Sequence, residues 1–325
     1  MSTVKLNASS RIMYEEAVSR GIHCTIFHDH ETILMEKDGH EWYVRGSRTS
    51  FQSSVGKTIA DKKPLTKEVL LHFNFPTGKF IKVGSKYGIT DELKEELSKF
   101  RFPIVMKPVD SRHGLGVIVG IRSIDELLAA YEPNTSMIVE EQLRGVEYRV
   151  VVVDFKFVAA AFRKPAHVIG DGKRTIEELV AEKNTHPWRG ESHTKNLTLI
   201  KIDDTVLENL AELHYTPTSI PKDGEEVLLR KTANLSTGGE AWNVSDQVHP
   251  TNRKIFEDIA RRCDLNVAGI DVMCDALNTP LTEQEFAGII EVNASPGLRM
   301  HHYPIQGEPV NVAGKILDGV MKRFA

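Results

Sequence analysis

Apolar and polar residues follow two different periods along the first part of the chain. Runs in which every second residue is apolar indicate strands, and runs with apolar residues every three or four positions indicate helices. These patterns predict a helix over 11–20, strands at 22–28, 31–36 and 40–45, and a helix that begins at Pro64. Gly21 directly follows the first predicted helix, as glycine commonly does where helices end.

The rest of the chain predicts more strands than helices, and several strands are close enough in sequence to form hairpins. Two capping-box patterns, Ser123–Glu126 and Thr175–Glu178, open helices expected to end near Tyr131 and Asn184. The predicted strands are 104–107, 117–121, 137–141, 148–153, 155–163, 226–230, 267–275 and 287–293, and further helices are predicted at 251–263 and from Pro309. Because hairpins dominate the middle of the chain and helices occur throughout, we expect an α+β fold of several lobes.

Composition narrows the class of protein and of partner. The chain has 325 residues, of which 41% are hydrophobic and 26% charged, so it can bury a large core in about two domains or one multi-lobed enzyme. Its net charge of −4 gives no reason to expect nucleic-acid or membrane binding, which favours small molecules as partners. Cys24, Cys263 and Cys274 are widely spaced and odd in number, which predicts free thiols. With no apolar signal core at the start, a cytoplasmic location is expected.

The strongest chemical signal lies in the last two predicted strands. Residues two apart in a strand share a face, so Glu291 and Asn293 are expected to project together, directly before Ser295-Pro296-Gly297. Asp271 is likewise an acid inside an otherwise apolar strand, where it needs compensation. If the strands are neighbours, the three side chains form an all-oxygen cluster suited to magnesium bridging ATP phosphates. The alternative is that these acids cap loops or pair with nearby arginines.

A lysine ends the strand predicted at 104–107, and a polar loop over 110–116 follows it. Lys107 can meet a phosphate as a point charge, and Gly114 and Gly116 would let backbone amides approach phosphate oxygens closely. An ordinary glycine turn in a hairpin is the commoner interpretation of such a loop. The segment therefore indicates phosphate binding only in combination with the other signals.

The segment from Val139 to Arg149 joins a predicted strand end to a charged connector. Such a connector can offer backbone groups to the edge of an adenine, while a carboxylate reaches the ribose hydroxyls. The alternative is a solvated charged turn.

Arg230 leaves an apolar strand and is followed by Asn234, Gly238 and Gly239. An arginine in this position can stabilise charge on a transferring phosphoryl group or a tetrahedral intermediate. The two glycines would allow a flexible flap over phosphates, and a surface turn is the alternative.

These segments occur in an order that resembles the ATP-grasp ligases, most closely the ATP-grasp modules of cyanophycin synthetase and of bifunctional glutathione synthetase. The passages that carry the resemblance are Arg163–Gly172, Arg230–Gly239 and Glu291–His302, and it extends over roughly residues 60–320. It implies an ATP-grasp fold with a short N-terminal lobe (1–62), a mobile lid subdomain (63–143) and a C-terminal mixed-sheet catalytic subdomain (144–325).

The resemblance also implies a role for each candidate residue. The residues implied in nucleotide binding are Lys63, Lys107, Ser111, Gly114, Gly116, Glu140, Glu141, Leu143 and Glu147, and Glu147 is implied to bind the ribose. Metal binding falls to Asp271, Glu291 and Asn293, and the reacting phosphate and substrate to Arg230, Asn234, Ser295 and Gly297. Lys62 is an alternative to Lys63, because the aspartate-then-lysine order selects Lys62 while the spacing to Thr66 and the helix register favour Lys63.

The implied activity is ATP-dependent formation of an amide bond between an amino-acid or peptide carboxylate and an amine, through an acyl phosphate. ATP and two Mg²⁺ ions are the implied cofactors, and Mn²⁺ is a possible substitute for Mg²⁺. A homodimer is a possible assembly. The alternatives are a glutathione-synthetase-type ligase, a phosphorylating or carboxylating enzyme, and a non-catalytic ATP-binding regulatory module.

Overall fold

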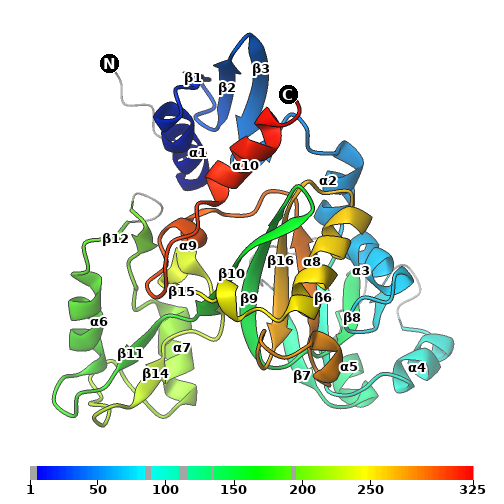
Figure 1. Ribbon diagram of the computed structural model, residues 1–325. Coiled ribbons are helices and arrows are strands. Elements are labelled where there is room, and N and C mark those ends of the chain that lie inside the picture. Colours follow the sequence, from blue (N-terminus) through cyan, green and yellow to red (C-terminus); the bar gives the residue numbers. More distant parts are fainter. Residues whose placement is uncertain (1–5, 85–88, 110–115, 133–134, 192–194, 325) are drawn as a thin grey trace.

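The computed structural model describes residues 6–84, 89–109, 116–132, 135–191 and 195–324. Helices and mostly antiparallel sheets are mixed along the chain, so the expected α+β class is confirmed. The three larger sheets form an N-terminal lobe, a central sheet and a second four-stranded sheet, and a smaller lobe extends from the central sheet (Figure 1).

The N-terminal lobe is a four-stranded sheet covered by the first and last long helices. Its elements are α1 (Ala8–Ser19), β1 (His23–Ile26), β2 (Thr32–Lys37), β3 (His40–Arg45), β4 (Arg48–Thr49) and α10 (Val312–Met321). The side chain of Asn7 caps α1 by accepting a hydrogen bond from the amide of Ser10 at 2.9 Å, so this helix begins earlier than its apolar pattern predicts. The first and last helices meet at this lobe, where α10 packs beside α1 (Figure 1).

The second four-stranded sheet follows in the chain, with strand order β5-β8-β6-β7. Its elements are β5 (Phe80–Val83), α4 (Asp91–Ser98), β6 (Ile104–Pro108), β7 (Ile118–Ile121), α5 (Ile124–Ala130) and β8 (Met137–Glu141). The Ser123 hydroxyl caps α5 by accepting from the Glu126 amide at 3.1 Å, as the capping-box pattern predicts. The helices α2 (Ser54–Asp61) and α3 (Lys63–His72) connect the N-terminal lobe to this sheet.

The central sheet has strand order β15-β10-β9-β16-β17, and all its neighbours are antiparallel. Its strands are β9 (Val146–Val153), β10 (Lys156–Lys164), β15 (Glu240–Asn243), β16 (Val267–Cys274) and β17 (Gly288–Asn293). In β9, Val150 and Val152 enter one apolar core with α8 (Pro250–Arg262), while Val151 and Val153 enter another with α10. Since both faces are covered there, β9 reads as a continuous apolar run rather than an alternating one.

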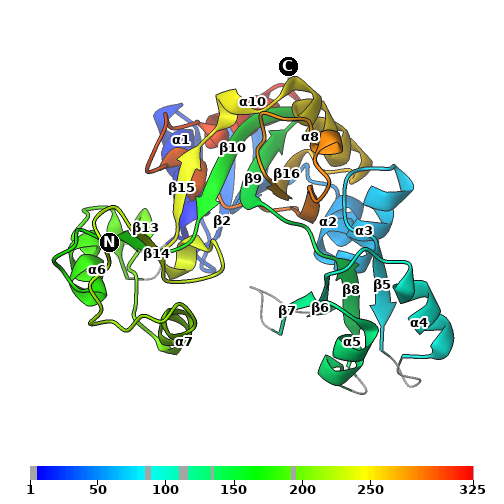
Figure 2. The same ribbon diagram turned by 90° about the horizontal axis from the view of Figure 1, so that it is seen from below.

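A smaller lobe is inserted between β10 and β15. Its elements are β11 (His167–Ile169), α6 (Ile176–Asn184), β12 (Arg189–Gly190), β13 (Leu197–Thr198), α7 (Asp204–Glu212) and β14 (Glu226–Leu228). Its core is separate and includes Val168, Leu179, Leu210 and Val227. In both views this lobe and the β5–β8 sheet extend from different ends of the central sheet (Figure 2).

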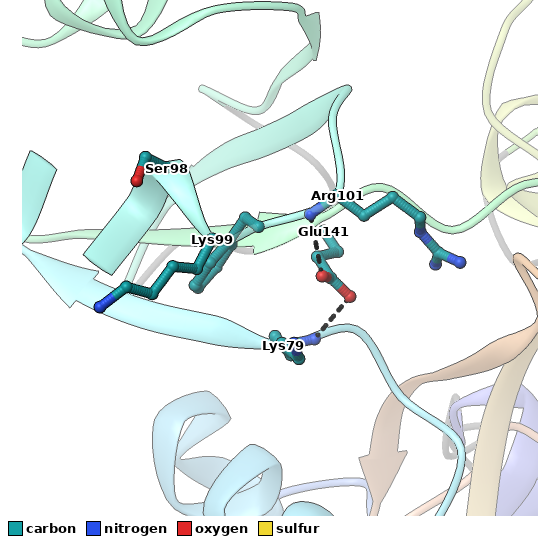
Figure 3. Close-up of a pocket in the computed structure, with 6 residues that line it drawn as sticks. Lys79, Ser98, Lys99, Arg101 and Glu141 are labelled. Atoms are coloured by element: carbon teal, nitrogen blue, oxygen red, sulfur yellow. Dashed lines mark hydrogen bonds between the residues drawn. The ribbon is translucent and has the colours of Figure 1, made fainter. Parts of the chain in front are cut away.

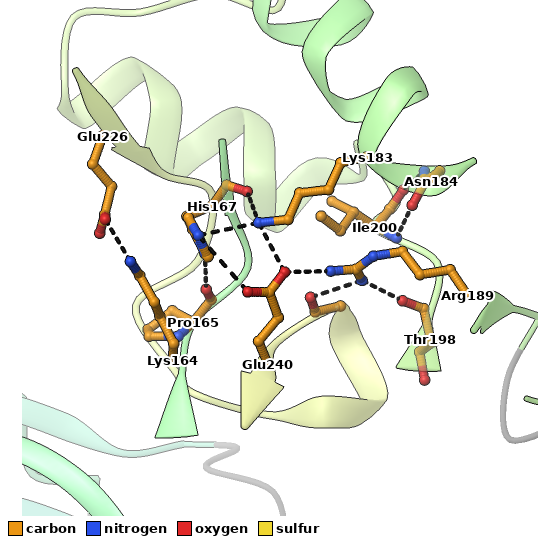
Figure 4. A network of polar contacts seen from close by, with 11 residues as sticks. Lys164, Pro165, His167, Lys183, Asn184, Arg189, Thr198, Ile200, Glu226 and Glu240 are labelled. Atoms are coloured by element: carbon orange, nitrogen blue, oxygen red, sulfur yellow. Dashed lines mark hydrogen bonds and ion pairs between the residues drawn. The ribbon is translucent and has the colours of Figure 1, made fainter. Parts of the chain in front are cut away.

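One buried carboxylate joins the inserted lobe to the central sheet. Glu240, the first residue of β15, is bound by Lys183 at 2.9 Å and by Arg189 at 2.8 Å (Figure 4). Arg189 also donates to the Thr198 carbonyl at 2.7 Å, and His167 lies 3.9 Å from Glu240. A single carboxylate therefore balances two cations that come from separate elements of the lobe.

Two smaller findings bear on the expectations from composition. Cys24, Cys263 and Cys274 are free, and burial raises the pKa of Cys263 and of Cys274 to about 12. Among the helices of the described residues, none combines the length and the apolar character that crossing a bilayer requires.

Candidate functional site

The two acids of the strongest sequence motif meet on one face of the central sheet. Asp271 on β16 lies directly opposite Glu291 on β17 in the antiparallel register. Asn293, two residues further along β17, donates its side-chain amide to Glu291 Oε1 at 3.0 Å. The structure thus brings the three predicted oxygen-bearing residues together, as the spacing of two within a strand requires.

Two arginines from the neighbouring strands extend this face. Arg149 is paired with Asp271 in the β9–β16 register and binds both carboxylate oxygens, with Nη2 to Oδ2 at 2.8 Å. Arg163 on β10 lies 3.6 Å from Asp271 and is ion-paired with Glu147 on β9. The face therefore carries arginines on β10 and β9 and acids on β9, β16 and β17; Arg149, Arg163 and Asp271 are buried, and Glu147 and Glu291 are partly exposed.

The pKa values of the facing acids shift in opposite directions. Burial opposes ionisation of Asp271, but the charge and hydrogen bonds of Arg149 together with the charge of Arg163 outweigh it, so the pKa of Asp271 is lowered. Burial raises the pKa of Glu291, and the negative charge of Asp271 raises it further. Burial likewise raises the pKa of Glu147, although Arg163 opposes this shift. Ionising the whole cluster therefore leaves negative charge that the two arginines do not compensate fully.

A divalent cation fits this unbalanced charge. The donors are carboxylate and amide oxygens, which hard cations such as Mg²⁺ prefer, and a cation beside Glu291 would offset its repulsion from Asp271. Among the described residues no group of three His, Cys, Asp or Glu side chains could hold a metal by itself. Mg²⁺ commonly binds one or two carboxylates and completes its shell with phosphate oxygens and water, so this donor set suits Mg²⁺ with a bound nucleotide.

A second buried charge cluster lies where the β5–β8 sheet meets the central sheet. Glu140 on β8 is ion-paired through Oε1 with Lys107 on β6 and through Oε2 with Lys67 on α3, the latter at 3.0 Å. Lys67 Nζ also donates to Thr77 Oγ1 at 2.7 Å and to the Ile289 carbonyl on β17 at 3.2 Å. Because Ile289 is two residues before Glu291, the predicted phosphate lysine and the predicted metal ligands are connected through consecutive contacts.

The next predicted residues, Arg230 and Asn234, lie on the loop that follows β14. Asn234 accepts a hydrogen bond from Arg163 Nη2 at 3.0 Å, which places it beside the arginines of the sheet face. Arg230 is ion-paired with Asp203, the residue that caps α7, while its buried Nε has no hydrogen-bond partner among the residues that the structure describes. Arg230 thus has a buried donor available for an acceptor supplied by a ligand.

The loop after β17 carries Ser295 and Gly297, both exposed. Its contacts are with the N-terminal lobe: Ser47 Oγ lies 3.4 Å from Ser295 Oγ and donates to the Pro296 carbonyl at 2.8 Å. The N-terminal lobe therefore supports the loop that the sequence predicts to line the substrate.

The remaining residues predicted to bind the nucleotide lie in different environments. Lys63 is the first residue of α3 and half-buried, whereas Lys62 before it is exposed. Leu143 lies against Gly288 at the start of β17, and Gly116 has a positive φ of 72° beside Pro108. Ser111 and Gly114 lie outside the described residues.

The side chain of Glu141 is hydrogen-bonded to the backbone of two other segments. Its carboxylate accepts from the backbone amides of Lys79 at 3.3 Å and Arg101 at 3.0 Å, and so joins two segments beside the sheet (Figure 3). A pocket of about 440 Å³ lies beside it, lined also by Ser98, Lys99 and Phe100. None of the residues that line this pocket belongs to the Asp271–Glu291 face, so we place the candidate site by its side chains and not by this pocket.

Three residues with specific contacts at the site were not assigned roles from the sequence. Arg149 and Arg163 organise the acids of the sheet face, and Lys67 shares Glu140 with Lys107. A signal for Arg149 existed, because it is a charge in a run of valines and, like Asp271, needs a buried partner. Lys67 follows Lys63 by one helical turn, but no sequence pattern indicates that it is buried.

Comparisons with known proteins agree with this arrangement. No family model matches the chain. Cyanophycin synthetase of Trichormus variabilis is 38% identical over 318 residues, covering 96% of this chain and 35% of the relative. The glutathione biosynthesis bifunctional protein GshAB of Clostridium perfringens is 33% identical over 322 residues, covering 96% of this chain and 41% of the relative.

A solved structure is also similar to this chain. The crystal structure of a bifunctional glutathione synthetase from Pasteurella multocida superposes with a TM-score of 0.81 at 26% identity, covering 98% of this chain and 44% of that chain. The chain thus spans less than half the length of these relatives. The resemblance expected from the sequence is confirmed, and it extends to nearly the whole chain.

Proposed function

The chain belongs to the ATP-grasp carboxylate–amine ligases in sequence and in fold, and on that premise we propose that it forms an amide bond between an amino-acid or peptide carboxylate and an amine, releasing ADP and phosphate. The observation that carries the proposal is the pairing of Asp271 with Glu291 in the β16–β17 register, on a face joined by contacts to Lys107. ATP-grasp ligases generally use ATP and Mg²⁺. The two-ion stoichiometry and Mn²⁺ as a substitute are part of the proposal.

The first half of the reaction is attack of the substrate carboxylate on the γ-phosphate, which forms an acyl phosphate and ADP. Asp271, Glu291 and Asn293 would hold Mg²⁺, which offsets the charge of the transferring phosphoryl group. Arg149 keeps Asp271 ionised and oriented through two contacts, so this ligand is prepared before the nucleotide binds.

The nucleotide would bind between the β5–β8 sheet and the central sheet. Lys63 and Lys107 would contact phosphates, together with the loop that contains Ser111, Gly114 and Gly116. The segment Glu140, Glu141 and Leu143 would present backbone groups to the adenine, and Glu147 would turn from Arg163 to the ribose. Closure of this subdomain, proposed as residues 63–143, would exclude water that hydrolyses an acyl phosphate.

The second half is attack of the amine on the acyl phosphate, with loss of phosphate. Arg230 has a buried Nε that no described residue accepts from, and we assign it to the oxyanion or the departing phosphate. Asn234 and the backbone amides near Ser295 and Gly297 would complete these donors. Removing one such donor typically lowers turnover by about 100- to 1,000-fold.

The proposal is tested by a phosphate-release screen of amino-acid and short-peptide pairs, with products identified by mass. A ligase releases phosphate only when both carboxylate and amine are present, and the product mass equals their sum minus water. ADP formation that needs no amine, gives no free phosphate and leaves a phosphorylated product would replace the proposal with a kinase.

Two alternatives are separated by the same screen. Product formation restricted to γ-glutamylcysteine with glycine would identify a glutathione-synthetase-type ligase. Binding of ATP without release for any pair would favour the non-catalytic module. We further propose small-molecule substrates rather than nucleic acid or membrane, a cytoplasmic location where ATP is available, and a homodimer as the assembly to examine first.

A further inference from the structure

The buried cluster around Glu140 contains more positive than negative charge. Glu140 is ion-paired with Lys67 and Lys107, and the exposed fractions of the three side chains are 11%, 3% and 11%, respectively. Burial lowers the pKa of Lys67, and Lys107 lowers it further, while Glu140 opposes the shift. Two cations on one carboxylate leave one positive charge in a water-poor place, which favours binding of an anion.

The geometry divides the carboxylate between the two lysines. Lys107 occupies Oε1 and Lys67 occupies Oε2, and the two lysines come from different elements, β6 and α3. Lys67 is fixed independently, because Thr77 Oγ1 and the Ile289 carbonyl accept from the same ammonium group. Thus Lys67 can neutralise Glu140 without moving, whatever Lys107 does.

From this division we propose that Lys67 is a positioning residue that holds the charge of Glu140, so that the Lys107 ammonium is free to turn toward a nucleotide phosphate. The inference rests on the proposed function, because it takes ATP as the ligand of Lys107. If Lys67 is absent, Glu140 keeps Lys107 as its counter-ion, and phosphate must compete with a buried carboxylate for the same ammonium.

The experiment compares ligands with and without phosphates. Binding of MgATP, MgADP and adenosine is measured by titration calorimetry with the full chain and its Lys67→Met variant. We expect about tenfold weaker binding of MgATP and MgADP, within the usual range of coupling between neighbouring sites. Adenosine should bind equally to both proteins. Equal loss for adenosine and MgATP would overturn the proposal, because it would show general damage to the site.

Two more variants separate charge from packing. Lys67→Gln keeps an amide that can donate to Thr77 and the Ile289 carbonyl but removes the charge, and it should weaken MgATP like Lys67→Met. If Lys67→Met does not fold, the Lys67→Gln variant alone tests the proposal. In Lys67→Met/Glu140→Gln the carboxylate that retains Lys107 is gone, so MgATP affinity should recover to within about threefold of the wild type. Weaker binding by the double variant than by Lys67→Met would overturn the proposal.

Lys254→Met is the matched control, since Lys254 is 80% exposed on α8 and loses the same charge. It should bind all three ligands like the wild type. If the wild type itself does not bind MgATP, the proposed function fails; if the wild type binds and the Lys67 variants bind equally well, only this inference fails.

Discussion

Asp271 and Glu291 lie directly opposite each other on β16 and β17, yet they differ in their partners and in the direction of their pKa shifts. Arg149 binds Asp271 through both carboxylate oxygens, whereas Glu291 accepts from Asn293. The site therefore contains one acid that is ionised in advance and one that is easily ionised only when a cation is present.

Glu291→Gln should stabilise the metal-free protein and abolish most of its turnover. The pKa of Glu291 is raised by folding, so above the ordinary carboxyl range its ionisation favours the unfolded chain. We expect the melting temperature at pH 7 to rise by about 2 °C, with the difference disappearing as the pH falls to about 4. Ligation should fall by at least about 100-fold. A variant that melts lower than the wild type at pH 7 would contradict the assigned repulsion.

Arg149→Met should destabilise the fold as well as the site. It removes the two contacts that compensate the buried Asp271 carboxylate, and leaving a buried charge without its partner costs about 3–5 kcal/mol. Urea unfolding followed by fluorescence measures the loss. In Arg149→Met/Asp271→Asn, most of the stability should return, because the Asp271 charge that Arg149 compensated is also gone. Additive losses in the double variant would show that the two residues do not act as a pair.

Arg230→Ala should separate nucleotide binding from ligation. We expect kcat to fall about 100-fold, because a donor to the oxyanion or departing phosphate is lost, while KM for ATP is unchanged. Arg174→Ala is the control, since Arg174 is also an ion-paired arginine of the inserted lobe, bound to Asp171 and Glu182 near its surface. Unchanged kcat in Arg230→Ala would remove this residue from the mechanism.

Glu240→Gln should loosen the inserted lobe from the central sheet. Lys183 and Arg189 would lose their shared carboxylate, so amide hydrogen exchange should accelerate between residues 165 and 239 and change little in α8. Burial raises the pKa of Glu240, but Lys183 and its other cationic neighbours lower it to below the ordinary value. The wild-type contribution is therefore present above about pH 4.3 and is lost as the pH falls below it. Exchange that is unchanged, or that accelerates uniformly, would contradict this role.

The sequence predicted elements best where the local signal and the tertiary environment agree. The helix opened by Thr175 runs over 176–184 with both hydrogen bonds of the capping box, and the β9–β10 hairpin forms as expected. The pattern of apolar and polar residues did not predict α2, β5, α4 or α7. The strand β5 has only four residues, and α4 is so polar that its single buried residue, Leu97, gives no periodic pattern.

The site was predictable where a strand register alone places side chains. Glu291, Asn293 and Asp271 meet because residues two apart share a face and the two strands are neighbours. The partners Arg149 and Lys67 were not assigned roles, because β9–β16 pairing and the packing of α3 join residues far apart in sequence. The roles of all these residues in binding and catalysis stay predictions until variants are measured.

The chain leaves the central sheet after Lys164 and returns at Glu240, and these two residues are paired with each other in the β10–β15 register. The entry and exit of the inserted lobe are therefore one strand spacing apart, about 5 Å. A short turn could close that gap, so the length and sequence of this excursion can change without shifting the register of any strand beneath it. The outer part of the lobe can thus be exchanged or shortened while the scaffold of the acidic pair is preserved, provided that the counter-ions of Glu240 and the loop with Arg230 and Asn234 are kept.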